Sequence, residues 1–226
     1  MEPRNFYYDP NFSDYLDPRF TRHLDPAAVG MIFEIGSRDG HDAVLLQRRF
    51  QAPVYAFECN PYALDECRAF LRDREGIVLI EKAAWNENTT LPFFPVIDTH
   101  RDGRRTLNQL GAASCLRARP DYIEKYTQTE VTVEAIRLDD FCRDRGISGV
   151  DFLCMDVQGA AIPVLEGLGG ILDTVRYLII ELEHRPIYQD QQLFPEVRSY
   201  LSRRGLILVE ETFQNDWYSN FLFIRR

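Results

Sequence analysis

The stretch Met31–Gly40 constrains the fold most, because it combines a short apolar run, an acidic residue and two glycines four positions apart. Apolar residues lead into Glu34, and Gly36 follows it. We expect a buried strand over 31–35, a sharp turn, and a helix over 41–49 whose start leaves free N–H groups facing the turn. Gly36 has no Cβ, so the backbone can turn there and also approach a ligand closely. By itself the pattern also fits an ordinary strand–turn–helix unit.

The charge of this turn indicates which kind of ligand it favours. A carboxylate at the end of a strand lies at the edge where open α/β sheets bind ligands. It would repel a phosphate, but it would attract an ammonium group or accept a hydrogen bond from a hydroxyl. The glycines are spaced G-x-x-x-G, so the dinucleotide fingerprint G-x-G-x-x-G is absent. The turn therefore favours a ligand with an amino-acid or nucleoside part over a pyrophosphate.

A second acidic strand end strengthens this interpretation. About 20 residues after Glu34, an apolar run over 54–57 ends at Glu58, and Cys59-Asn60-Pro61 then turns the chain into a helix. A carboxylate in that position can accept hydrogen bonds from both hydroxyls of a ribose. The alternative is a helix N-terminal carboxylate that stabilises the helix dipole. The two acidic strand ends predict a pocket for a nucleoside without an essential phosphate, a description that S-adenosylmethionine fits.

Strands and helices alternate along most of the chain. We expect strands over 31–35, 53–57, 77–80, 150–156 and 177–184, and helices over 41–49, 61–74, 161–167 and 195–204. Such alternation predicts an α/β fold, a parallel sheet with helices on both faces. Two final apolar runs, 206–209 and 220–224, flank a turn at 214–216 and predict an antiparallel pair.

Two segments break the alternation. Residues 1–28 are rich in aromatic residues and in Asp-Pro pairs, which are turn or helix-start signals. We expect an N-terminal arm or cap there that packs on the domain or on a second subunit of a homodimer. The domain itself, 29–226, carries an insertion at 86–137. Within the insertion we expect strands near 89–96 and 129–136, joined over 97–128 by a long polar loop that contacts substrate and closes the pocket.

Composition excludes several classes of function. The 226 residues, of which 45% are hydrophobic, suit one elaborated domain. The net charge of −9 argues against a nucleic-acid partner, which requires a basic face, and against adhesion to anionic membranes. No apolar run approaches the roughly 20 residues of a membrane span, and the N-terminus lacks the apolar core of a signal peptide. The five cysteines show no C-x-x-C spacing, which indicates reduced thiols in a cytoplasmic protein.

From about residue 30 onward the chain resembles the FkbM-type S-adenosylmethionine-dependent methyltransferases. The motifs that carry the resemblance are Phe33–Gly40, Ala56–Pro61, Arg137–Asp140 and Val150–Ala160, the last followed by Val164–Gly167. The resemblance implies the Rossmann-like class I methyltransferase fold, with a seven-stranded, mostly parallel sheet whose last strand is antiparallel. It also implies methyl transfer to a hydroxyl of a sugar, a glycolipid or a natural product. The chain departs from the family pattern at Arg38, usually an asparagine-like residue, and at Gln158, often a glutamate.

The resemblance also implies a set of cofactor contacts. The methionine end of the cofactor would lie by Glu34 and the turn after it, the ribose at Glu58, and the adenine beside Cys59 and Asn60. Ser114 would contact the cofactor carboxylate or the substrate. The implied cofactor-binding residues are Glu34, Gly36, Ser37, Arg38, Gly40, Glu58, Cys59, Asn60, Ala83, Ala84 and Ser114.

Two residues are candidates for the catalytic base. Asp156 ends a central strand and could take a proton from the acceptor, or it could instead cap the following helix. His184 could accept a proton near neutral pH, or it could be an ordinary surface histidine. These two would form an oxygen-rich metal site with Glu181 and Glu183 only if all four converged. Alternation along a strand puts His184 opposite the two glutamates, so we expect no metal.

The sequence leaves three functions to compare. The first is an S-adenosylmethionine-dependent O-methyltransferase acting on a small-molecule or glycan acceptor. The second, an NAD-type dehydrogenase, is disfavoured by the missing third glycine. The third is a non-catalytic binding or assembly module that keeps the fold, hinted at by Arg38 and Gln158.

Overall fold

The central sheet has the expected topology. The structure, a computed structural model, describes residues 11–101, 103–107 and 110–226. Within these residues one sheet contains, in spatial order, β12 (Leu206–Phe213), β13 (Tyr218–Arg225), β11 (Tyr177–Glu183), β10 (Phe152–Met155), β1 (Ile32–Ile35), β2 (Val54–Phe57) and β3 (Ile77–Ile80). Only β13 runs against the other six described strands, because it pairs antiparallel with both β11 and β12. The predicted Rossmann-like α/β fold with an antiparallel last strand is confirmed.

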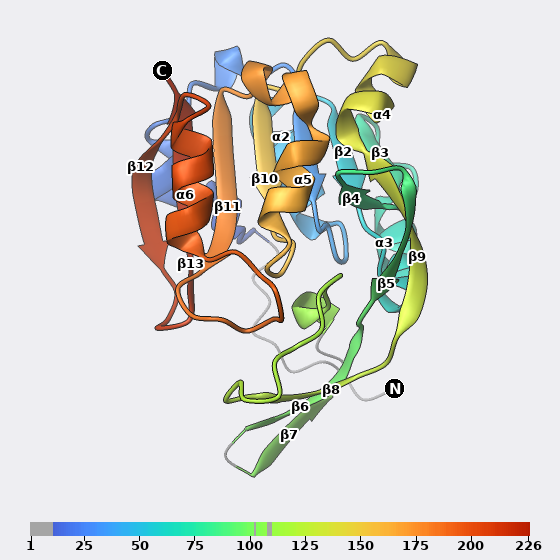
Figure 1. Ribbon diagram of the computed structural model, residues 1–226. Helices are drawn as coiled ribbons and strands as arrows, with labels where there is room; N and C mark the ends of the chain where they lie inside the picture. The colour runs from blue at the N-terminus through green and yellow to red at the C-terminus, as the bar shows by residue number, and fades with distance from the viewer. Residues whose placement is uncertain (1–10, 102, 108–109) are drawn as a thin grey trace.

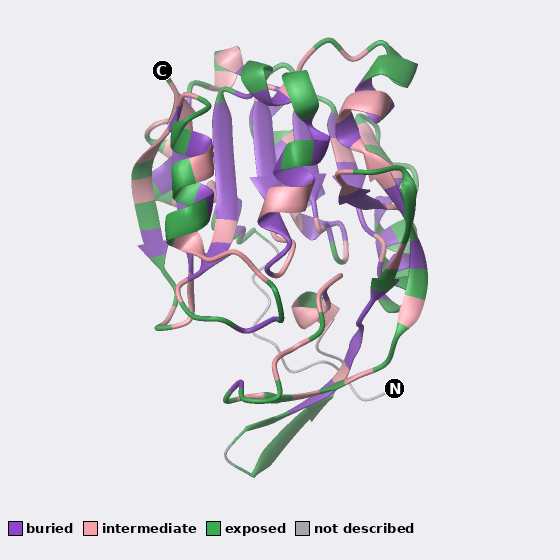
Figure 2. Cartoon of the chain, viewed as in Figure 1, coloured by how far each residue is buried: buried purple, intermediate pink, exposed green. Residues whose placement is uncertain are grey.

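Helices cover both faces of this sheet, as Figure 1 shows with α5 and α6 in front of it and α2 behind. One face packs against α4 (Leu138–Arg145), α5 (Ala161–Gly167) and α6 (Phe194–Ser202). The other packs against α2 (His41–Phe50), α3 (Pro61–Leu71) and the N-terminal segment. Side chains alternate between the faces, so Phe33 enters the first layer and Ile32 the second. Burial on both sides explains why the central strands are mostly apolar (Figure 2).

The N-terminal segment packs on the domain from residue 11 onward. It contains η1 (Asp14–Leu16), α1 (Pro18–Thr21) and η2 (Pro26–Ala28). In two of the Asp-Pro pairs the aspartate caps the short helix behind it: Asp17 accepts from the Arg19 N–H at 2.7 Å, and Asp25 from the Ala27 N–H at 3.0 Å. Tyr15 and Phe20 are buried against the sheet. The pair Asp9-Pro10 and the aromatics before it lie outside the described residues, and the boundary at residue 28 stays a prediction.

The expectation of a long loop over 97–128 is wrong. The strands β6 (Val96–Arg101), β7 (Arg104–Leu107) and β8 (Lys125–Gln128) form a small sheet, and η3 (Leu110–Ala112) follows β7. Asp98 joins its strands by accepting from Arg105 Nη2 at 2.6 Å and from Thr127 Oγ1 at 2.7 Å. This hairpin extends away from the main sheet and is largely exposed (Figures 1 and 2). Its strands therefore carry polar residues on both faces and lack the alternation by which strands are predicted.

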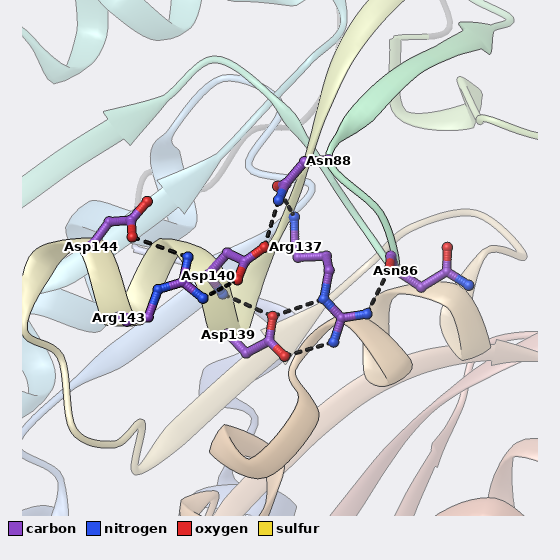
Figure 3. A network of polar contacts seen from close by, with 7 residues as sticks. All are labelled: Asn86, Asn88, Arg137, Asp139, Asp140, Arg143 and Asp144. Carbon is purple, nitrogen blue, oxygen red and sulfur yellow. Dashed lines mark hydrogen bonds and ion pairs between the residues drawn. The ribbon is translucent and has the colours of Figure 1, made fainter.

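A second small sheet connects the insertion to the domain. It contains β4 (Ala83–Trp85), β9 (Val131–Arg137) and β5 (Thr89–Phe93) in that order. A polar network fixes the end of β9 on α4 (Figure 3). The Arg137 guanidinium donates to both carboxylate oxygens of Asp139, at 2.9 and 2.6 Å, and to the Asn86 carbonyl oxygen at 2.7 Å. Asn88 accepts from the Arg137 backbone N–H and donates to Asp140. The motif Arg137–Asp140 is thus used to join two elements.

Some expected element ends are wrong by a few residues. The helix expected over 61–74 ends at Leu71, and α6 ends at Ser202 with Arg203 as its C-cap. Gly205 lies in the turn into β12 at φ +78°. A short η4 (Gly169–Thr174) follows α5. The predicted pairing of the last two strands is confirmed. In the described part of the chain, no helix combines the length and apolar character that a membrane span requires.

Candidate functional site

A cavity lies at the carboxyl ends of β1, β2 and β10. Its non-atom space is about 850 Å³, part of it open to solvent. The insertion closes one side through η3 and the residues that follow it, and Tyr15 of the N-terminal segment contributes to the wall. The cavity is at the edge of the sheet where ligands bind in open α/β folds.

The turn after β1 is built around Gly36. Its φ is +89°, and a Cβ there would stand 1.9 Å from the carbonyl oxygen of Asp156, so no other residue fits. The N–H groups of Gly36 and Ser37 both donate to the carbonyl oxygen of Phe57, at 2.9 and 3.0 Å. Arg38 follows in the left-handed region at φ +51°. The turn is therefore held by its two neighbouring strands.

Glu34 lies behind this turn and is not among the residues that line the cavity. It shares the face of β1 that carries Ile32, which points toward α2, and it is 1% exposed. Its carboxylate accepts from Ser37 Oγ at 2.6 Å, and burial with the nearby Asp42 carboxylate raises its pKa well above the usual value. Gly40 also lies outside the cavity, because it caps α2 and faces Leu71. The structure thus gives both residues a role in supporting the turn.

Glu58 lies in the cavity wall at the end of β2. Its carboxylate accepts from the backbone N–H groups of Arg38 at 2.6 Å, Cys59 at 2.8 Å and Asn60 at 2.6 Å. Burial raises the pKa of Glu58 to about 7, although these three bonds favour the ionised form. Asn60 caps α3 by accepting from the Tyr62 N–H at 3.1 Å. Glu58 therefore joins the turns after β1 and β2 and keeps a carboxylate at the cavity.

Asp156 lies in the wall opposite, in the turn after β10. Gln158 Nε2 donates to Asp156 Oδ1 at 2.6 Å and to Glu181 Oε1 at 3.0 Å. Tyr188 Oη donates to Gln158 Oε1 at 2.6 Å. Burial raises the pKa of Asp156 to about 6, while the bond from Gln158 lowers it. A carboxylate with a pKa near 6 is ionised at neutral pH and can accept a proton.

The turn after β2, strand β4 and the insertion supply the remaining wall. Ala83 and Ala84 of β4 line the cavity, as do Cys59 and Ser114. Ser114 Oγ donates to the carbonyl oxygen of Gln158 at 2.7 Å and accepts from the Leu116 N–H at 2.9 Å. Ser114 therefore fastens the insertion to the turn that carries Asp156.

His184 is outside the cavity. It is the first residue after β11, and its Nε2 lies 2.9 Å from Ser219 Oγ of β13. Its ring packs edge-on against Phe194 and Phe221, with centroids 5.9 and 5.7 Å away. The contacts of His184 are those of a structural histidine, so only Asp156 of the two candidate bases lies at the cavity. Among the described residues, no three His, Cys, Asp or Glu side chains are grouped so that they could hold a metal ion.

The cavity brings together most of the residues singled out from the sequence. Those in its wall are Gly36, Ser37, Arg38, Glu58, Cys59, Asn60, Ala83, Ala84, Ser114 and Asp156. Sequence reasoning gave no site role to other wall residues, among them Tyr15, Asp42, Trp85, Phe93 and Val164. Val164 belongs to the motif Val164–Gly167, whereas no motif marks the other positions. Whether the wall residues contact a cofactor stays a prediction.

The sequence profile of the methyltransferase FkbM domain matches residues 34–208, most of the chain. The chain belongs to the FkbM methyltransferase family. Within this family it is similar to the 2-O-methyltransferase NoeI of Sinorhizobium fredii, with 29% identity over 166 residues. That alignment covers 71% of the present chain and 66% of NoeI, so the chain spans about two thirds of the curated relative that it matches.

Solved structures show the same fold. The fibrillarin pre-rRNA processing protein of Methanococcus jannaschii is similar with a TM-score of 0.51 and 16% identity, over 89% of this chain and 69% of that one. The magnesium protoporphyrin IX methyltransferase of Synechocystis PCC 6803, solved with bound S-adenosylmethionine, is similar with a TM-score of 0.50 and 9% identity, over 91% and 74% of the two chains. At these identities the likeness concerns the fold of this FkbM-family chain.

Proposed function

We propose that this FkbM-family protein is an S-adenosylmethionine-dependent O-methyltransferase. The observation that carries the proposal is that Glu58 and Asp156 flank one cavity at the carboxyl edge of the sheet, with the Gly36 turn between them. The Gly36 turn packs against the Asp156 carbonyl oxygen and lines the cavity, and Glu58 is the acidic strand end that can accept hydrogen bonds from ribose hydroxyls. The residues present therefore fit the cofactor.

Each part of the wall has a role in this proposal. Glu58 accepts from the ribose hydroxyls, and Ala83, Ala84 and Cys59 provide the apolar surface for the adenine. The turn Gly36–Arg38 receives the amino-acid end. S-adenosylmethionine supplies a methyl carbon activated by a sulfonium. Asp156 orients the acceptor hydroxyl and takes its proton as the new carbon–oxygen bond forms and the carbon–sulfur bond breaks.

The acceptor in this proposal is a hydroxyl of a small molecule or a glycan. NoeI is named as a 2-O-methyltransferase, and this chain shares the FkbM domain with it. The net charge of −9 disfavours a nucleic-acid acceptor, which binds through a basic face. The insertion lines one side of the cavity through Phe93, Leu110 and the residues up to Cys115, and in this proposal the acceptor enters from that side.

Calorimetric titration with S-adenosylmethionine and S-adenosylhomocysteine tests the cofactor assignment. Methyl transfer is then followed from methyl-labelled cofactor to a panel of sugars and glycosides. Binding of both ligands together with labelled product is the expected result. Folded protein that binds neither ligand contradicts the assignment, and binding without product over the whole panel favours the non-catalytic module.

A further inference from the structure

The side chain of Gln158 joins three groups that come from different parts of the chain. Its amide nitrogen donates to the carboxylates of Asp156 and Glu181, and its amide oxygen accepts from the Tyr188 hydroxyl. An amide nitrogen carries two protons, so both donors are used. The two carboxylate acceptors also determine which end of the amide faces Asp156. The side chain therefore has one orientation that satisfies all three partners.

The backbone of Gln158 is fixed as firmly as its side chain. Its φ is +48°, in the left-handed region that residues other than glycine seldom adopt. Its carbonyl oxygen accepts from Ser114 Oγ, and the Tyr188 hydroxyl lies 3.0 Å from the Ala112 carbonyl oxygen. The insertion therefore contacts this turn directly through Ser114, and indirectly through the Tyr188 hydroxyl, which lies between Ala112 and the Gln158 side chain. A strained backbone persists only where its surroundings hold it, and such positions concentrate at functional sites.

The surroundings of Asp156 and Glu181 are mostly acidic. Burial raises the pKa of Asp156 to about 6 and raises the pKa of Glu181 well above its usual value. The titratable and charged groups that face the two carboxylates from other positions are Asp14, Tyr15, Arg38, Glu58, Glu183, Tyr188 and Tyr218. Arg38 is the cation in this set. A glutamate at position 158 would add a further carboxyl group, whereas glutamine donates hydrogen bonds without adding charge.

We propose that Gln158 is a positioning residue whose amide keeps Asp156 ionised and aimed into the cavity at neutral pH. The proposal rests on the proposed function, since it assumes that the Asp156 carboxylate faces the sulfonium of the bound cofactor. An ionised carboxylate attracts the sulfonium and can accept the proton of an acceptor hydroxyl, and a protonated one does neither. The amide stabilises the ionised form by donating to it.

The test compares two ligands that differ in charge at one atom. S-adenosylmethionine carries a sulfonium, and S-adenosylhomocysteine carries a neutral thioether. We would measure both dissociation constants calorimetrically on the full chain from pH 5 to pH 7.5. In the ratio of the two constants, the titration of Glu58 cancels because both ligands carry the same ribose. In the wild type we expect the preference for S-adenosylmethionine to grow about tenfold as Asp156 ionises.

The variants Q158E and Q158M both remove the amide donor. The midpoint is the pH at which the preference for S-adenosylmethionine has risen halfway. In each variant we expect this pH to rise by about one unit, because Asp156 loses a hydrogen bond that favours its ionised form. Q158M adds no charge, so it keeps the test open if Q158E fails to fold in a thermal melt. Q189E is the matched control. It makes the same glutamine-to-glutamate substitution at Gln189, which is exposed in the loop after β11. Its midpoint is expected to equal that of the wild type.

The outcomes separate the two proposals. Midpoint shifts in Q158E and Q158M but not in Q189E support the positioning role. Weaker binding of both ligands with an unchanged midpoint means that Gln158 is only structural and overturns the inference. A wild-type ratio that does not vary with pH, with both ligands bound, also overturns it and leaves the cofactor assignment standing. If the folded wild type binds neither ligand, the proposed function fails and the inference fails with it.

Discussion

A Cβ on Gly36 would stand 1.9 Å from the carbonyl oxygen of Asp156. The turns after β1 and β10 therefore touch because position 36 has no side chain. The strands are neighbours in parallel register, with Ile35 opposite Met155, so the residues that follow are brought together. This contact places the glycine turn beside the carboxylate that we propose as the base.

Replacing Gly36 with alanine should separate the two turns. The added methyl cannot coexist with the Asp156 carbonyl group, so we expect the loss of cofactor binding and a destabilisation of about 1–3 kcal/mol or more. Calorimetry and thermal unfolding measure the two effects. Gly146→Ala is the matched control, because Gly146 also has a positive φ, +67°, but no neighbouring atom in the described part of the chain lies within 4 Å of its Cβ position. Equal losses in the two variants would contradict the steric explanation.

Removing the Glu58 carboxylate should weaken the binding of S-adenosylmethionine and S-adenosylhomocysteine alike. We expect Glu58→Ala to cost about 1–3 kcal/mol of binding, because ribose hydroxyls and three backbone N–H groups lose their acceptor. Titration calorimetry gives the two constants. Glu81→Ala serves as a control, since Glu81 pairs with Arg68 on the surface. An unchanged dissociation constant in Glu58→Ala would remove Glu58 from the site.

The two candidate bases should respond differently to substitution. Asp156→Asn should lower turnover by roughly 10²–10⁴-fold, the usual contribution of general acid–base catalysis, with a smaller effect on cofactor affinity. His184→Gln should leave turnover nearly unchanged, because the His184 ring contacts Ser219 and phenylalanine rings away from the cavity. Steady-state rates on an acceptor found in the hydroxyl panel measure both. A severe loss of turnover in a folded His184→Gln protein would reverse the assignment.

The buried Glu183 carboxyl group should make stability depend on pH. No described residue makes a hydrogen bond to one of its oxygens, and burial raises the pKa of Glu183 from 4.5 to about 8. Between these values the folded state binds more protons than the unfolded state, so this group makes the free energy of unfolding fall as pH rises. Glu183→Gln should remove the penalty and stabilise the protein at pH 8.5 by about 2–4 kcal/mol relative to its effect at pH 4.

Denaturant unfolding at the two pH values measures the effect of Glu183→Gln. Glu75→Gln is the control, because Glu75 is exposed and loses the same charge. A stabilisation by Glu183→Gln that does not change with pH would show that Glu183 does not titrate in this range.

The Arg137 network should contribute to stability without affecting the cavity. We expect Arg137→Met to lower the free energy of unfolding by about 1.5–3 kcal/mol, because it breaks the bidentate pair with Asp139 and frees the Asn86 carbonyl group. Arg143→Met, at a guanidinium that is 69% exposed, should cost at most about 1 kcal/mol. Denaturant unfolding measures both. A large loss of cofactor affinity in a folded Arg137→Met protein would show that the network also shapes the site.

The sequence by itself determined the sheet, its order of strands and helices, and one side of the candidate site. Strand alternation, glycine turns and acidic strand ends depend on residues that are neighbours along the chain, so their burial pattern can be read locally. Glu58 and Asp156 were found in this way. Sequence reasoning also placed Glu34 beside the cofactor. In the structure its side chain lies behind the turn, because Glu34 shares a face of β1 with Ile32.

Only the tertiary structure decided the rest of the wall. Tyr15, Gln158 and Tyr188 meet near one cavity although they are far apart in sequence, and His184 turns toward β13. The hairpin β6–β7 escaped prediction because its strands are mostly polar, even at the buried Asp98 and Thr99, and so lack the alternation of apolar and polar residues. Contacts of this kind follow from how the elements pack against one another. No local pattern of apolar and polar residues encodes that packing.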